Sequence, residues 1–258
     1  MNKTAQNRIE EIKKNGYTLD FGNVFNQTFE NYKKIALYAG LVFFVFAVVV
    51  ALVGTVVLFS IFDSETIASY FRPENFTPEN FDLNTILIVS TISVLITSLL
   101  SPLSAGLIKM AYYADKDEEF HLSTLFEYYK APYLIELLIA TFVVTLLKTI
   151  IGSTLNYLQI PLLDVIISIV VGLFTIVMIP LIIFGNLKAI EAIKASIVVV
   201  SKQPLTLLGL LVVGFIATMV GFIGCCIGVF FTLPFIYSLY FVIYREIIGF
   251  DTDVEPTI

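Results

Sequence analysis

Residues Gln203–Tyr244 read QPLTLLGLLVVGFIATMVGFIGCCIGVFFTLPFIYSLYFVIY, a run of 42 residues without one charged side chain. Lys202 and Arg245 flank the run. As a helix it would be about 63 Å long, which is roughly two crossings of a bilayer core of about 30 Å. Small residues from Gly221 to Cys226 interrupt its centre. The run therefore predicts a transmembrane hairpin with spans at 205–222 and 226–246.

The composition of the whole chain is typical of a membrane protein. Of the 258 residues, 58% are hydrophobic, and the mean hydropathy is +0.91. Soluble domains average about 45–50% apolar residues. The net charge is -6, and no basic cluster resembles a nucleic-acid footprint. We therefore expect membrane lipids around the chain and no nucleic-acid partner.

Further apolar runs extend this plan over the rest of the chain. They predict spans at 35–62, 85–108, 133–155 and 164–185. A short amphipathic segment precedes each predicted hairpin, at Asp20–Lys34, Leu122–Tyr129 and Leu187–Lys202. The predicted fold is all-α: a polytopic membrane helix bundle of six transmembrane helices. These helices form three hairpins, each preceded by a short interfacial amphipathic helix on the cytoplasmic side.

The polar ends of the chain lie outside this predicted membrane domain, which covers residues 20–248. Residues 1–19 are charged, and we expect a flexible cytoplasmic N-terminus there. Residues 249–258 are expected to be an acidic cytoplasmic tail. The first apolar run is far longer than the h-region of a signal peptide, so it predicts an uncleaved anchor.

The three predicted hairpins share one further feature, a proline near or past the middle of the returning span. These prolines are Pro102, Pro180 and Pro234. Their recurrence suggests a weak internal repeat, in the arrangement of the helices more than in the sequence, as is common in membrane folds.

The distribution of lysine and arginine predicts the orientation. Six precede the first span, three lie in each of Lys109–Lys130 and Leu187–Lys202, and Arg245 adds one more. The opposite side has only Arg72, and Lys148 lies inside a span. Basic residues favour the cytoplasmic side. Both termini are therefore predicted to be cytoplasmic.

The loop 63–84 is predicted to face the periplasm or the cell exterior. It contains two tandem segments, Pro73–Phe76 and Pro78–Phe81. Both read Pro-Glu-Asn-Phe, and Thr77 links them. A local duplication accounts for this repeat, and a binding loop is the alternative.

Hydroxyl side chains mark one face of the second span. Ser90, Ser93, Thr97, Ser101 and Ser104 follow one another at steps of three or four residues. Small hydroxyl residues of this kind favour close helix packing in membranes. The functional alternative is a polar wall that lines a path through the membrane.

Three charged residues mark the second predicted hairpin. Glu136 lies near the start of its span, while Lys148 and Asp164 lie equally far on either side of Asn156, the predicted turn. Charges at membrane depth usually pair or face an aqueous cavity. We therefore predict an ion pair between Lys148 and Asp164, with snorkelling to the interface or a role in transport as the alternatives.

Catalytic and metal-binding patterns are absent from the sequence. His121 is the single histidine, and the adjacent Cys225 and Cys226 match no zinc pattern. Phosphate-binding loops and nucleophile elbows are also missing. We expect no catalytic residue, no metal and no cofactor, and therefore no enzyme activity.

Several short motifs resemble a bacterial membrane family. They are Phe21-Gly22 with Phe25 and Phe29; Pro102-Leu103, Ala105-Gly106, Leu122 and Leu125-Phe126; Ala192–Ser196; and Pro234 with Tyr237, Tyr240 and Tyr244. The chain resembles the six-span membrane domain fused to some glycerophosphodiester phosphodiesterases, and related stand-alone membrane proteins. Since the phosphodiesterase domain has no counterpart in these residues, the resemblance implies a membrane module and transfers no catalytic residue.

Two functional hypotheses follow from these patterns. The first is a membrane module that binds lipid, another membrane protein or a second copy of itself. The second is a transporter or channel for a small solute or ion, which would use the Ser90–Ser104 face with Lys148 and Asp164. A transporter predicts one water-filled cavity reached by Ser93, Thr97 or Lys148.

Overall fold

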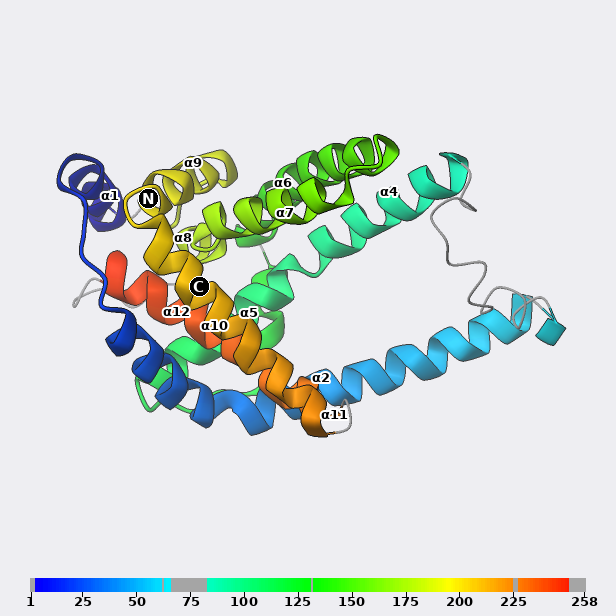
Figure 1. Ribbon diagram of the computed structural model, residues 1–258. Coiled ribbons are helices and arrows are strands. Elements are labelled where there is room, and N and C mark those ends of the chain that lie inside the picture. The colour runs from blue at the N-terminus through cyan, green and yellow to red at the C-terminus, as the bar shows by residue number, and fades with distance from the viewer. Residues whose placement is uncertain (1–2, 62, 66–82, 131, 225–226, 251–258) are drawn as a thin grey trace.

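The computed structural model describes residues 3–61, 63–65, 83–130, 132–224 and 227–250, and Figure 1 shows their arrangement. All the regular secondary structure assigned in these ranges is helical. The α-helices are α1 (Lys3–Asn15), α2 (Phe21–Ile61), α4 (Leu83–Leu99), α5 (Ser101–Asp115), α6 (Tyr133–Tyr157), α7 (Pro161–Phe174), α8 (Met178–Ile183), α9 (Ala189–Val200), α10 (Pro204–Met219), α11 (Ile227–Thr232) and α12 (Pro234–Ile247). The 3-10 helices are η3 (Leu122–Tyr129) and η4 (Val220–Gly224).

Six helical stretches are long and apolar enough to cross a membrane. They are Phe21–Ile61, Ile86–Asp115, Tyr133–Tyr157, Pro161–Ile183, Pro204–Ile223 and Ile227–Ile247. The prediction of an all-helical, multi-pass membrane bundle is confirmed.

The first span and its amphipathic segment form one helix and not two. Helix α2 runs for 41 residues without a break, or about 61 Å. The carboxylate of Asp20 caps its start by accepting a hydrogen bond from the Asn23 amide at 2.7 Å. No proline occurs in α2, so the helical hydrogen bonds continue through the predicted boundary between Lys34 and Ile35. The first half of α2 therefore extends well beyond a bilayer core.

The N-terminal segment, for which the sequence predicts flexibility, forms helix α1. Its side chains Ala5 and Ile12 are buried. The Arg8 Nε donates to the carbonyl of Ile247 at the end of α12, at 3.2 Å. The Gln203 side chain holds the following linker by accepting from the Leu19 amide and donating to a neighbouring carbonyl. A narrow apolar stripe within the charged sequence accounts for this docking, while the flexibility predicted for residues 1–19 stays a prediction.

All three returning spans are broken close to the prolines that the sequence singles out. The second span divides into α4 and α5 at Leu100, with Pro102 in the first turn of α5. The fourth divides into α7 and α8 at 175–177, just before Pro180. The sixth divides into α11 and α12, where Pro234 begins α12. Proline lacks the amide hydrogen that a continuous helix needs, which explains the common position of the breaks.

The segments after these breaks pack together at the end of the molecule that holds both chain ends, which we call the terminal end (Figure 1). Their aromatic rings meet there. Tyr112 of α5 lies 5.4 Å from Phe184, which follows α8, and 6.2 Å from Phe241 of α12, measured between ring centroids. Phe250, at the start of the predicted tail, packs edge-to-face with Tyr112, and their ring centroids are 5.1 Å apart. The main hydrophobic core therefore sits at the terminal end.

In the first predicted hairpin, α2 contacts the returning span through α5, and α4 diverges from α2. Helix α2 packs against α11 and α12, while α4 packs along α6, and α2 and α4 point apart toward the other end of the molecule (Figure 1). We call that end the loop end, because the end of α2, the start of α4 and the α6–α7 turn lie there. The contact of α2 with α11 is close, since a Cβ added at Gly40 would lie 2.8 Å from the Cα of Phe231.

Each amphipathic segment keeps apolar side chains at the surface of the terminal end. Phe21 and Phe29 of α2 are exposed, as are Leu122 and Phe126 of η3. In α9 the predicted apolar face is only partly buried, because Ile190 and Ile197 remain exposed. Small residues of α9 are buried in their place, namely Ala189, Ala192, Ala195 and Ser196.

Candidate functional site

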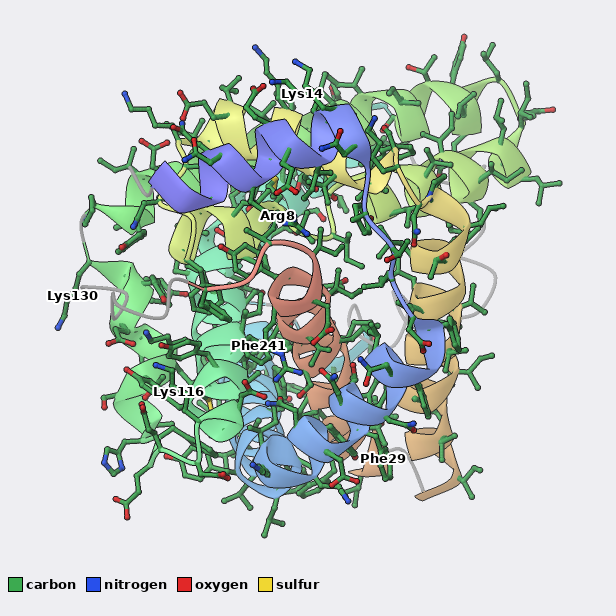
Figure 2. All side chains as sticks on the ribbon, turned by 90° about the vertical axis from the view of Figure 1, so that its left-hand side faces the viewer. Arg8, Lys14, Phe29, Lys116, Lys130 and Phe241 are labelled. Carbon is green, nitrogen blue, oxygen red and sulfur yellow. The ribbon has the colours of Figure 1, made fainter. Side chains whose placement is uncertain are left out.

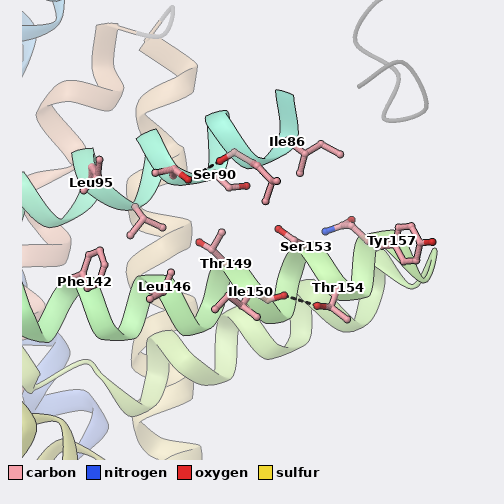
Figure 3. A pocket seen from close by; sticks show the side chains of 14 residues that line it. Ile86, Ser90, Leu95, Phe142, Leu146, Thr149, Ile150, Ser153, Thr154 and Tyr157 are labelled. Atoms are coloured by element: carbon pink, nitrogen blue, oxygen red, sulfur yellow. Dashed lines mark hydrogen bonds between the residues drawn. The ribbon is translucent and has the colours of Figure 1, made fainter. Parts of the chain in front are cut away.

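A groove of about 880 Å³ lies between α4 and α6 on the loop-end half of the molecule (Figure 3). Helix α4 contributes Ile86, Leu87, Ser90, Thr91, Val94 and Leu95. Helix α6 contributes Phe142, Leu146, Thr149, Ile150, Ser153, Thr154, Asn156 and Tyr157. This volume lies in the range of ligand sites, which is about 300–1,000 Å³.

Polar groups concentrate in the part of the groove nearer the loop end. Thr91 and Thr154 donate their hydroxyl hydrogens to carbonyls of their own helices, Leu87 O at 2.7 Å and Ile150 O at 2.8 Å. Their oxygens are left as acceptors. Ser90, Thr149 and Ser153 have no hydrogen-bond partner within the described part of the chain. The groove therefore presents several unused hydroxyl groups (Figure 3).

The opposite part of the groove is apolar. Leu95 lies across from Phe142 and Leu146 there (Figure 3), and Val94 also lines the groove. From Phe142 to Tyr157 the groove extends for about 22 Å along α6. It thus changes from apolar to hydroxyl-lined along the direction in which a membrane helix crosses from the bilayer interior to its surface.

The polar end of the groove is fixed by the turn between α6 and α7. The Asn156 Nδ2 donates to the Gly152 carbonyl at 2.9 Å and to the Asp164 carboxylate at 3.1 Å. A Cβ at Gly152 would lie 2.6 Å from the same carboxylate, so only glycine allows this approach. Gln159 turns the chain with a φ of 59°. With both hydrogens of its amide group used, Asn156 offers only its Oδ1 to a ligand.

The predicted hydroxyl face of the second span does not line one cavity. Ser90 lines the groove, but Ser93 and Thr97 are exposed and do not line it. Ser101 is buried, and its hydroxyl donates to the carbonyl of Ser98 at 2.7 Å. Ser104 lies on the far side of the break at Leu100. The break at Leu100 and the rotation of α4 toward α6 separate residues that an ideal straight helix would align.

The three predicted charged sites are also separated. Asp164 pairs with Asn156, and no ion pair joins it to Lys148 among the described residues. Lys148 is exposed on α6, about 140° around the helix from Ser153. Glu136 accepts a hydrogen bond from the Ala189 amide at 2.7 Å, at the start of α9. A carboxylate there is favoured by the free amides and dipole of the helix N-terminus, so Glu136 has a structural role.

Sequence reasoning missed the residues that α6 contributes to the groove. A signal was available, since Thr149 and Ser153 lie four residues apart and Asn156 follows three residues later. Hydropathy gives no means to choose between this hydroxyl stripe and the one on α4, because both lie in equally apolar runs.

No cluster of three or more histidine, cysteine, aspartate or glutamate side chains occurs among the described residues. The cysteine pair Cys225–Cys226 and the repeats Pro73–Phe76 and Pro78–Phe81 lie outside those residues. So does the predicted tail after Phe250.

Comparisons with protein-family models, curated proteins and solved structures gave no match to this chain.

Proposed function

We propose that this protein is a six-span, non-enzymatic protein of a bacterial inner membrane that binds a membrane lipid in the groove between α4 and α6. The observation that carries this proposal is the set of unpartnered hydroxyls of Ser90, Thr149 and Ser153. A polar group without a partner in an apolar medium is costly, and a lipid headgroup or its bound water would satisfy it.

The proposed orientation has both termini in the cytoplasm. Arg8, Lys14, Lys116 and Lys130 lie on the terminal end (Figure 2). Basic residues are retained on the cytoplasmic side of inner-membrane proteins. The exposed apolar side chains of the amphipathic segments lie at the same end, where they would enter the cytoplasmic leaflet. The loop end would then face the periplasm or cell exterior.

In this orientation the groove occupies the outer leaflet. One leaflet with its headgroups is about 20–22 Å thick, and the groove extends for about 22 Å along α6. Its apolar part would lie near the bilayer centre and its hydroxyls nearer the outer surface. This gradient matches a single lipid, with an acyl chain at one end and a headgroup at the other.

The transporter hypothesis receives less support from the same geometry. It required Ser93, Thr97 or Lys148 to reach one aqueous cavity, but none of the three lines the groove. The resemblance to the membrane domain of glycerophosphodiester phosphodiesterases stays a proposal, and it adds no catalytic residue. We also propose that the chain has no nucleic-acid partner.

The test is photo-crosslinking in lipid vesicles. The protein is reconstituted into dioleoyl-phosphatidylcholine vesicles. In separate samples the vesicles contain diazirine-acyl phosphatidylglycerol or diazirine-acyl glucosyl-diacylglycerol. After illumination, peptide mass spectrometry maps the adducts. We expect at least one probe to label α4 or α6 beside the groove.

Two variants with the same chemical change provide the control. Ser153→Phe fills the groove and should abolish the adducts. Ser93→Phe places the same ring on the outward side of α4 and should preserve them. Adducts spread evenly over all lipid-facing helices, or equal labelling of the two variants, would contradict lipid binding in the groove.

A further inference from the structure

We infer that the groove selects a lipid with an uncharged, hydroxyl-bearing headgroup, such as a glycosyl- or glycerol-type lipid, over lipids whose headgroup carries a phosphate. This inference rests on the proposed lipid-binding function and specifies the ligand. The argument depends on which hydrogen-bonding groups remain available in the groove and on the charges around it.

The first argument concerns charge. None of the fourteen side chains that line the groove is basic. Phosphate groups are usually held by arginine or lysine side chains, or by the amides of a helix N-terminus. Ser90 and Thr91 lie well past the first turn of α4, where the influence of the helix dipole has faded. The lining of the groove therefore supplies no positive charge to balance that of a phosphate.

A carboxylate beside the groove has the unfavourable sign for a phosphate. The Asp164 carboxylate lies directly behind Asn156, which lines the groove, and the two are joined by the 3.1 Å hydrogen bond. In a low-dielectric environment, a negative headgroup close to this carboxylate would be repelled. An uncharged headgroup avoids that repulsion.

The second argument concerns hydrogen-bond direction. Asn156 uses its amide hydrogens on Gly152 and Asp164, so that its Oδ1 can only accept. Thr91 and Thr154 have also donated their hydrogens to backbone carbonyls. The groove thus presents pure acceptors beside the hydroxyls of Ser90, Thr149 and Ser153, which can both donate and accept. Sugar and glycerol hydroxyls can pair with both kinds of group, whereas a phosphodiester group can only accept.

The test is a competition experiment with the diazirine-acyl glucosyl-diacylglycerol probe. The unlabelled competitors are glucosyl-dioleoylglycerol, dioleoylglycerol, dioleoyl-phosphatidylglycerol and dioleoyl-phosphatidylethanolamine, added to phosphatidylcholine vesicles. We expect the two uncharged lipids to displace the probe at mole fractions about tenfold lower than the phospholipids, because no basic side chain lines the groove to balance a phosphate charge and the Asp164 carboxylate lies beside it.

Variants then test the charge argument. Ser153→Lys places an ammonium group in the groove and should shift the preference toward phosphatidylglycerol. Ser93→Lys adds the same charge on the outward side of α4 and should leave the preference unchanged. Should Ser153→Lys fail to fold, Asn156→Ala removes the acceptor and should weaken glucosyl-lipid binding by about fivefold without improving phospholipid binding.

The outcomes separate the two proposals. Specific adducts in the groove with equal competition by phospholipids and uncharged lipids would overturn the headgroup preference and leave lipid binding intact. Stronger competition by either phospholipid would also overturn the preference. The absence of groove adducts with every probe would overturn both proposals.

Discussion

Gly106 of α5 lies directly against the backbone of Leu125 in η3, where a Cβ at position 106 would be 2.6 Å from the Leu125 Cα. Real Cβ atoms do not approach a backbone atom this closely, so any side chain at this position must push η3 away. The contact allows the side chain of Leu125 to be fully buried. It therefore attaches the connecting segment to the bundle.

We expect Gly106→Ala to destabilise the protein by about 1–3 kcal/mol, the usual cost of overpacking. The matched control is Gly54→Ala, because a Cβ at Gly54 would meet no atom within 4 Å. The measurement is the thermal midpoint of the helical circular dichroism signal in detergent. A lower midpoint for the Gly106 variant alone is the expected result. Equal midpoints for the two variants would show that η3 does not pack as described.

The docking of α1 gives a second prediction. Ile12 is completely buried, and a helix of thirteen residues is marginal on its own in water. Ile12→Ala should cost about 2–5 kcal/mol of packing energy. Once undocked, α1 should unfold, and its amides should exchange hydrogen for deuterium as fast as those of an unfolded peptide.

The control for α1 is Glu10→Ala, on the exposed side of the same helix. It should leave the exchange of the α1 amides slow. If α1 in the unsubstituted protein already exchanges at the unfolded rate, the segment is flexible, and the prediction from the sequence was the better one.

The pKa of Glu127 provides a pH-dependent prediction. Burial raises the pKa of this carboxyl group, and the positive charges of Lys109 and Lys130 offset only part of the rise. A raised pKa means that the folded protein binds the proton more tightly than the unfolded chain does. Stability from this group is therefore present at low pH and is lost as the pH rises above the ordinary glutamate value.

Glu127→Gln should consequently raise the thermal midpoint at neutral pH, and this gain should disappear below about pH 4. Glu119→Gln is the control, since Glu119 is exposed in the preceding loop. It should change the midpoint little at either pH. A gain for Glu127→Gln that is the same at both pH values would show that ionisation of Glu127 is not the cause.

The number of membrane-spanning helices and the positions of the helix breaks could be predicted from the sequence. Both depend on local chemistry. A charge-free run such as Gln203–Tyr244 has few alternatives to membrane helices, and prolines such as Pro102 and Pro234 interrupt helices wherever they occur. The N-cap at Asp20 was predictable for the same reason.

The pairing of the helices and the groove could not be predicted. In a membrane, a lipid-facing side chain and a buried one are equally apolar, so hydropathy does not reveal which way a helix faces. Thus Ser93 and Ser90 looked equivalent in the sequence, although only Ser90 lines the groove. Likewise, the spacing of Lys148 and Asp164 suggested an ion pair, while the rotation of α6 placed Asn156 beside the carboxylate.

The account depends most on the chain crossing the bilayer with the groove open to the outer leaflet. Single-cysteine labelling tests this directly, in a background where Cys225 and Cys226 are replaced by alanine. Tyr157→Cys marks the polar end of the groove, where the tyrosine is 87% exposed, and Glu119→Cys marks the terminal end. In intact cells, a membrane-impermeant maleimide should label position 157, and it should label position 119 only after the membrane is opened. Labelling of both positions from the same side would contradict the proposed topology and the lipid site that depends on it.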